Sequence, residues 1–105
     1  MDDREFNALA DATLARIEAG LEASGADLDW EMKPGGVLDI EFADGSRIIV
    51  NRHGVAREIW VAARSGGFHF RHDGSAWRDT RDGEALMAKL SALATAQAGE
   101  AVDLA

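Results

Sequence analysis

The middle of the chain consists of short segments in which apolar and polar residues alternate, separated by glycine-containing turns. Such alternation is typical of strands that bury only one face. Turns as short as Lys33–Gly36 and Asp44–Gly45 join strands that run antiparallel. The expected strands cover residues 28–32, 37–42, 46–51, 58–63, 68–72 and 76–78. The pattern therefore predicts an antiparallel meander of five or six strands.

Segments with a helical spacing of apolar residues flank this meander on both sides. The first helix is expected from about Asp3 to Leu21, with Asp2 as its N-cap. The second is expected from Asp82 or Glu84 until Gly99 ends it. Each helix has one apolar stripe that must pack on another element. We therefore predict an α+β two-layer sandwich, with the N- and C-terminal helices packed on one face of a five- or six-stranded antiparallel sheet.

The length and composition of the chain fit one globular domain, which we place at residues 1–105. Residues 100–105 carry no periodic pattern and are not assigned to an element. The chain has no cysteine, which excludes thiolate metal sites. No segment approaches the ~18 apolar residues of a membrane span, and the acidic N-terminus is unlike a targeting peptide. We expect a cytoplasmic protein that does not associate with membranes.

Acidic residues are concentrated in the first third of the chain. Residues 1–31 contain nine acids and two arginines, so they carry −7 of the net charge of −8. A strongly acidic protein repels the nucleic-acid backbone and attracts metal cations or basic protein surfaces. We therefore expect no nucleic-acid partner, and we expect the binding surface to lie in this third.

Part of this acidity follows one flank of the first helix. On a helical wheel Asn7, Asp11, Glu18 and Glu22 lie together. Glu18 and Glu22 are one turn apart, where like charges destabilise a helix, so helix stability does not explain them. A solvated helix face is the plain alternative. Clustered carboxylates can bind iron without thiolates, although exposed ones bind it weakly and with little selectivity.

The parity of the strand residues assigns the two faces of the sheet. In residues 28–32 and 37–42 the apolar positions, Met32 among them, are expected to face the core, and the acids Asp29, Glu31, Asp39 and Glu41 are expected to face solvent. Trp60 has the opposite parity to its apolar neighbours Ile59 and Val61. We therefore expect an exposed tryptophan, which is a candidate contact for a partner protein.

The remaining charged and titratable residues receive plain interpretations. Because His69 and His72 differ in parity and His53 is expected in a loop, the histidines are expected to be scattered rather than to form a metal site. Five arginines are expected to pair across strands with Asp39, Glu41 and Glu58: Arg47, Arg52, Arg57, Arg64 and Arg71. No phosphate loop, HExxH motif or activated serine is found, so we expect no enzyme, with ferroxidase activity left open.

Several motifs spread over the whole chain resemble those of the bacterial frataxins, the CyaY family. They are Glu5-Phe6, Leu9-Ala10-Asp11, Gly35-Gly36-Val37-Leu38, Phe42, Asp44-Gly45-Ser46, Ile49-Val50-Asn51-Arg52, Ile59-Trp60-Val61-Ala62, Gly66-Gly67-Phe68-His69-Phe70 and Gln97-Ala98-Gly99-Glu100. Each motif is weak by itself, and together they are specific. The sequence departs from the family pattern at Asn7, Ala19, Val55 and Glu58 and is shorter at residues 23–26.

The resemblance implies an iron-binding accessory protein of iron-sulfur cluster assembly. In this family a cysteine desulfurase and an iron-sulfur scaffold protein are the partners, and the protein delivers or senses iron. The matching acids for weak surface binding of ferrous and ferric iron are Asp3, Asp11, Glu18, Glu22, Asp27, Asp29 and Glu31. The matching partner contacts are Trp60, Asn51, Arg52, Glu18 and Glu22.

Three functions therefore stay open. The first is a monomeric iron-binding regulator that docks on the cysteine desulfurase through its acids. The second is an iron-storage or ferroxidase-type protein that oligomerises on iron loading. The third is an acidic interaction module that is indifferent to metals.

Overall fold

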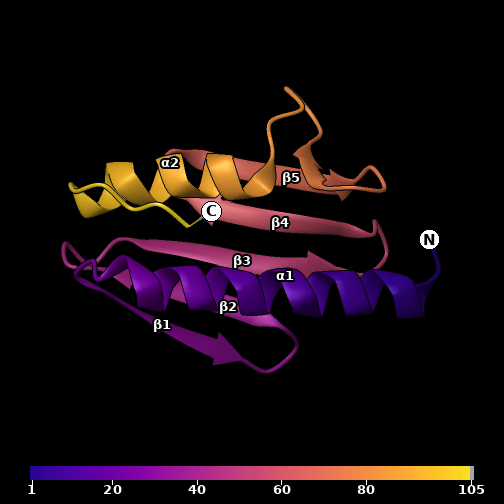
Figure 1. Cartoon of the computed structure of the whole chain (residues 1–105), viewed down its shortest axis with the longest axis horizontal. Helices are drawn as coiled ribbons and strands as arrows, with labels where there is room; N and C mark the ends of the chain where they lie inside the picture. Colours follow the sequence, from indigo (N-terminus) through magenta and orange to yellow (C-terminus); the bar gives the residue numbers. More distant parts are fainter. Residues whose placement is uncertain (105) are drawn as a thin grey trace.

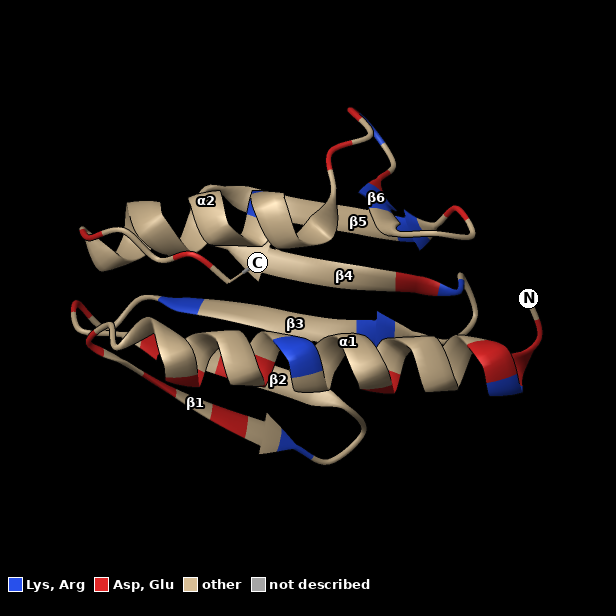
Figure 2. Cartoon of the chain, in the orientation of Figure 1, with Lys and Arg blue, Asp and Glu red and all other residues tan. Residues whose placement is uncertain are grey.

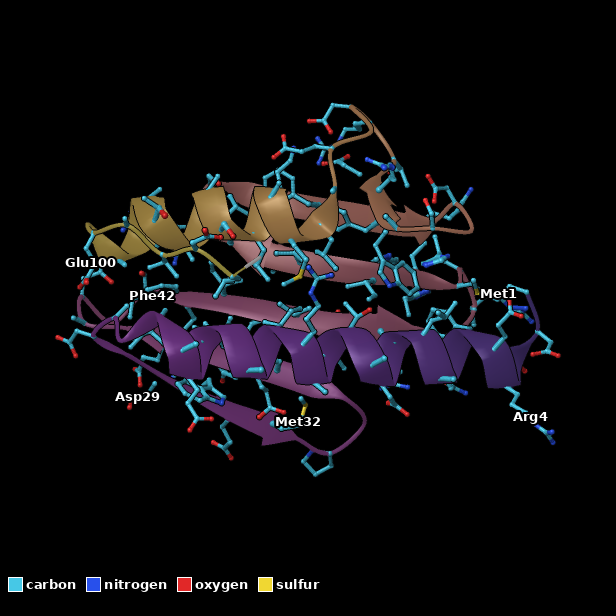
Figure 3. The ribbon with its side chains drawn as sticks, in the orientation of Figure 1. Met1, Arg4, Asp29, Met32, Phe42 and Glu100 are labelled. Carbon is cyan, nitrogen blue, oxygen red and sulfur yellow. The ribbon has the colours of Figure 1, made fainter. Side chains whose placement is uncertain are left out.

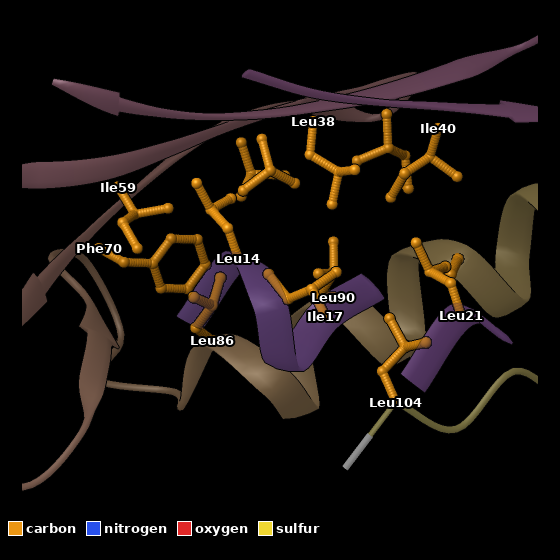
Figure 4. Close-up of a cluster of buried hydrophobic side chains, with 14 of the residues drawn as sticks. Leu14, Ile17, Leu21, Leu38, Ile40, Ile59, Phe70, Leu86, Leu90 and Leu104 are labelled. Carbon is orange, nitrogen blue, oxygen red and sulfur yellow. The ribbon is translucent and has the colours of Figure 1, made fainter. Parts of the chain in front are cut away.

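The computed structural model describes residues 1–104 as two helices and six strands. The elements follow one another as α1 (Asp3–Ser24), β1 (Leu28–Lys33), β2 (Val37–Phe42), β3 (Arg47–His53), β4 (Glu58–Ala63), β5 (Gly66–His72), β6 (Trp77–Asp79) and α2 (Leu86–Ala98). The strands form one antiparallel sheet in the order of the sequence. Both helices lie on the same face of this sheet (Figures 1 and 4). The predicted α+β two-layer sandwich is confirmed, with six strands.

The first helix begins where its capping residues predict. The Asp2 side chain accepts a hydrogen bond from the Glu5 N–H at 2.8 Å, which satisfies one of the free amides of the first turn. The helix continues to Ser24, three residues beyond the predicted end at Leu21. It stops there because Gly25 adopts a left-handed conformation, with φ of 65°.

The hydrophobic core fills the space between the two helices and the inner face of the sheet (Figure 4). From the helices it takes Phe6, Leu14, Ile17, Leu21, Leu86 and Leu90, and from the strands Leu38, Ile40, Phe42, Ile48, Val50, Ile59, Val61, Phe70 and Trp77. These are the positions that the helical and strand periodicities predict to be apolar and inward.

Burial is weaker in β1, the edge strand. Leu28 and Trp30 are only half-buried, and Met32 is 38% exposed although it has the parity of the core residues. Met32 therefore has the predicted parity, but the prediction that its side chain is buried in the core is wrong. The reason is its position: β1 has a neighbouring strand on one side only.

The second helix begins at Leu86 rather than at Asp82 or Glu84, so the predicted start is wrong. The residues before it are held by β6 instead. Asp79 donates its N–H to the Glu84 carbonyl at 2.8 Å, and Ala85 forms a β-bridge with Arg78. These contacts keep residues 84 and 85 extended, and the helix ends as predicted before Gly99.

The C-terminal residues contribute to the core, which the sequence pattern did not reveal. Val102 and Leu104 are both buried. Their backbone is held by two hydroxyl groups of α2, because Val102 N–H donates to Thr95 Oγ1 at 3.0 Å and Leu104 N–H donates to Ser91 Oγ at 3.0 Å. Leu104 also lies against Gly20 of α1, where a Cβ atom would come within 2.9 Å of the Leu104 carbonyl oxygen.

Candidate metal and partner-binding surfaces

The predicted acids gather along α1 and β1, the two elements at one side of the molecule (Figure 2). Glu18 and Glu22 lie on α1, in the layer of the helices, whereas Asp29 and Glu31 lie on the opposite face of β1, as the register with Glu41 and Asp39 shows. Figure 3 shows Asp29 pointing away from the strand into solvent. The edge of β1 therefore lies between two groups of acids.

The upstream acids of this set are bound by arginines. Asp11 forms an ion pair with Arg52 of β3, and the Arg52 guanidinium also donates to Asn7 Oδ1 at 3.1 Å. Asp3 forms an ion pair with Arg57 at 2.8 Å. Asp3 and Asp11 are thus partly neutralised, and the prediction that Arg52 and Arg57 pair across strands is wrong because both reach α1 instead.

The downstream acids are not bound by arginines or lysines in ion pairs among the described residues. Within residues 1–104 no ion pair involves Glu18, Glu22, Asp27, Asp29 or Glu31. All are exposed except Glu18, which is half-buried. In the same part of the chain no three His, Asp or Glu side chains converge into a group that could hold a metal ion. The arrangement is therefore an open negative surface rather than a coordination cage.

Beside these acids, the outer face of β1 and β2 also carries a network of paired charges. Asp39 is buried, with Lys33 Nζ at 2.9 Å and Arg47 Nη1 at 2.8 Å from its Oδ2. The hydrogen bond from Lys33 lowers the pKa of Asp39 below its ordinary value. Arg47 also pairs with Glu41 at 3.4 Å, so the predicted cross-strand pairing of Arg47 is confirmed. The burial of Asp39 beneath these side chains was not predicted.

Trp60 lies on the outer face, as predicted, but it is half-buried. His53 and His69 stack on its two sides, with ring centroids 3.8 Å and 4.4 Å from that of Trp60. Asn51 is its direct neighbour on β3, whereas Arg52 has the opposite parity and points to the helices. The structure thus brings Asn51 and Trp60 together and separates Arg52 from them. Two of the three histidines are not scattered, contrary to expectation.

A buried carboxylate holds this stack in place. Glu58 accepts hydrogen bonds from Trp60 Nε1 at 2.9 Å and from Arg71 at 2.6 Å, and His69 Nδ1 lies 3.8 Å away. Burial opposes the ionisation of Glu58, but the bonds from Trp60 and Arg71 outweigh it and lower the pKa of Glu58. Because both ring faces of Trp60 are covered, only its edge is available to a partner. The pair of Arg71 with Glu58 was predicted.

Comparisons with known proteins point in one direction. A family model described as a frataxin-like domain matches residues 1–100. The chain is 71% identical over 104 residues to the iron-sulfur cluster assembly protein CyaY of Dechloromonas aromatica, covering 99% of each chain. It is 50% identical to the protein of the same name from Cupriavidus pinatubonensis, covering 99% of this chain and 96% of that one.

Solved structures show the same fold. The frataxin of Psychromonas ingrahamii superposes with a TM-score of 0.92 at 34% identity, covering 100% of this chain and 99% of that chain. Trimeric yeast frataxin complexed with ferrous iron has a TM-score of 0.69 at 22% identity, covering 95% of this chain and 88% of that one, and this likeness concerns the fold alone. Neither helix of residues 1–104 has the length and apolar character needed to cross a membrane.

Proposed function

The chain belongs to the frataxin-like family, as its sequence motifs predicted, and from this premise we propose that it is an iron-binding accessory protein of iron-sulfur cluster assembly. Its relatives are named as assembly proteins. In this proposal the protein docks on the cysteine desulfurase through its acids, presents the Trp60 face to the scaffold protein, and delivers or senses iron without catalysing a reaction itself.

The observation that carries the proposal is the group of unpaired acids Glu18, Glu22, Asp27, Asp29 and Glu31. Arginines occupy Asp3 and Asp11, so a cation that binds there has to displace an existing ion pair. Among residues 1–104 the five downstream carboxylates form no ion pair, although Lys33, which bonds to Asp39, also attracts Glu31. Their oxygens suit hard or borderline cations such as iron. We therefore place weak iron binding at the C-terminal half of α1 and at β1.

The same charges favour a basic protein surface as the docking partner. Complementary charge accelerates encounter and weakens with salt, because the interacting groups are exposed. The Trp60 edge, with Asn51 beside it, lies on the outer face of the sheet, on β4, whereas Glu18 and Glu22 lie in the helix layer and Asp29 and Glu31 lie at the β1 edge. Because β2 and β3 separate β1 from β4, the acids and Trp60 can contact two partners at once.

Nuclear magnetic resonance with anaerobic Fe(II) tests the iron site. We expect titration to broaden or shift the amides of residues 18–31 and to leave those of Asp3 and Asp11 nearly unchanged. Glu18→Gln with Glu22→Gln should weaken the effect, whereas Glu5→Gln with Glu100→Gln, an equal loss of charge elsewhere, should not. If Fe(II) changed only the amide signals of other residues, or changed the signals equally in both variants, the iron site would not lie at residues 18–31.

Titration with the cysteine desulfurase at low and high salt tests the docking surface. We expect affinity to fall as salt rises and to be lost in Glu18→Lys with Glu22→Lys. Normal binding by this variant would show that the acids are not the docking surface. Size measurement during aerobic iron loading separates this function from iron storage, for which the protein would have to assemble into larger particles and consume oxygen.

A further inference from the structure

The two edges of the sheet differ in how well they are closed. The β6 edge is three residues long, and Ala85 bridges to Arg78 beyond it. The β1 edge is six residues long and pairs with β2 in an unbroken register from Leu28 to Lys33. No strand among residues 1–104 covers its other side. A long regular edge of this kind is a template for a further strand.

The backbone groups at this edge can be assigned from the hydrogen bonds of its neighbours. Phe42, which lies opposite Leu28, donates its N–H to the Ser46 carbonyl on the β3 side at 2.9 Å. The pair of Leu28 and Phe42 is therefore not hydrogen-bonded, and such pairs alternate along an antiparallel ladder. It follows that the N–H and C=O groups of Trp30 and Met32 point away from β2, to the open edge. The Leu28 N–H is already used by the Ala26 carbonyl at 2.9 Å.

The side chains beside this edge form two rows of different character. On the outer face lie Asp29 and Glu31, which are exposed and have no ion pair among residues 1–104. On the helix face lie the half-buried Trp30 and the 38% exposed Met32, which is labelled at the rim of the molecule in Figure 3. A neighbouring strand would thus meet Asp29 and Glu31, followed by Lys33 at the end of β1, on one face and apolar side chains on the other.

We propose that β1 receives an extended basic segment of a partner protein as a seventh strand of the sheet. Its backbone would pair with the free groups of Trp30 and Met32, and its side chains would alternate, with Lys or Arg beside Asp29 and Glu31 and apolar residues beside Trp30 and Met32. Over these four positions the occupant therefore alternates basic and apolar residues, and the position beside Lys33 is not basic.

A second copy of this chain does not fit the same edge. In an antiparallel pair of β1 strands centred on Trp30 or Glu31, Glu31 of one chain would lie beside Asp29 or Glu31 of the other, and like charges on neighbouring strands are destabilising. Repulsion between these acidic side chains thus disfavours self-association through β1, whereas a basic strand is attracted to the same edge. This docking mode does not require iron, and it adds a backbone contact to the charge contacts of the proposed function.

A synthetic peptide of alternating lysine and valine tests the proposal on the full-length protein. At saturating peptide we expect amide hydrogen exchange to slow at Trp30 and Met32 and to change little at Asp29 and Glu31, whose groups already pair with β2. Methylating the peptide nitrogens that face β1 should weaken binding at least about tenfold, because the interstrand hydrogen bonds are lost. Equal binding of the methylated peptide, or no protection at Trp30 and Met32, would overturn strand addition even where charge-based docking on the acids survives.

Charge reversal supplies the matched variant. In Asp29→Lys with Glu31→Lys the new side chains would face Glu41 and Asp39 across the strands, so the fold should be kept. We expect this variant to lose the lysine–valine peptide and to bind a glutamate–valine peptide instead. Glu5→Lys with Glu100→Lys changes the net charge equally at exposed positions and should leave the peptide preference unaltered. An identical change of preference in both variants would contradict a site at β1.

Discussion

Asp11 of α1 and Arg52 of β3 form an ion pair that joins the first helix to the sheet across 41 positions of sequence. Arg52 is well covered, with 17% of its side chain exposed, whereas 69% of the Asp11 side chain is exposed. The ion pair therefore holds the Arg52 side chain in a covered position, whereas the Asp11 carboxylate stays largely exposed to solvent. It also divides the acids of the chain into an arginine-bound upstream group and a free downstream group.

Replacing Arg52 should both loosen the fold and extend the iron-binding surface. We expect Arg52→Gln to lower the free energy of unfolding by about 1 kcal/mol, a modest value because Asp11 is largely solvated. Fe(II) should then perturb the Asp11 amide, since no cation competes for its carboxylate. Urea unfolding and Fe(II) titration measure these effects, with Arg16→Gln as the control of equal charge. An undisturbed Asp11 in the variant would show that Arg52 does not keep iron away.

Gly36 should be more sensitive to substitution than Gly35, although both have positive φ, 74° and 86°. A Cβ at Gly36 would lie 2.5 Å from Arg52 Nε, whereas nothing lies within 4 Å of a Cβ at Gly35. Both alanine variants strain the backbone, and only Gly36→Ala also displaces Arg52 from the helix. We expect it to cost at least about 1 kcal/mol more in urea unfolding. The excess should disappear when Arg52→Gln is added, and its persistence would place the cause elsewhere.

Truncating the side chain of Leu104 should destabilise the protein strongly for a residue so near the end of the chain. Leu104 is 2% exposed, and removal of a buried leucine side chain typically costs about 2–4 kcal/mol. We expect a loss of this size in urea unfolding of Leu104→Ala. Glu100→Ala, at an exposed position of the same segment, should stay within about 0.5 kcal/mol of the parent.

Stability should fall in acid partly because of Glu58. Its pKa is lower in the folded protein than in the unfolded chain, so the unfolded chain binds protons more readily. The stabilisation is complete above the ordinary glutamate pKa of about 4.3 and is lost as the pH falls through the folded value. Urea unfolding from neutral pH down to about pH 3 should therefore show a shallower decline for Glu58→Gln than for the parent. A parental slope in Glu58→Gln would mean that the carboxylate is not stabilised by Trp60 and Arg71.

The sequence pattern predicted the elements of this fold well because local rules govern them. Asp2 marks the start of α1, although the helix runs past the predicted end at Leu21, and the parity of residues in β2 and β4 gives their inward faces. The start of α2 was not predictable in this way, because Ala85 is held extended by Arg78, a tertiary contact. The burial of Val102 and Leu104 likewise depends on hydroxyl groups of α2 and has no periodicity of its own.

The sequence predicted which residues belong to the candidate surfaces better than it predicted which of them lie in contact. The line of acids along α1 follows from the helical wheel. The ion pair that binds Asp11, however, depends on Arg52, a residue far away in the sequence. The stack of His53 on Trp60 needed the end of β3 to be known, since His53 was expected in a loop. The role of these residues in iron binding and docking stays a prediction.

The position of Leu104 against Gly20 has a consequence for folding. All six strands and α2 lie between these two residues in the sequence. A contact between residues so far apart closes a long loop, and loop closure costs chain entropy that local contacts do not. We therefore expect this corner of the core to form late in folding, after the meander and α2 are in place.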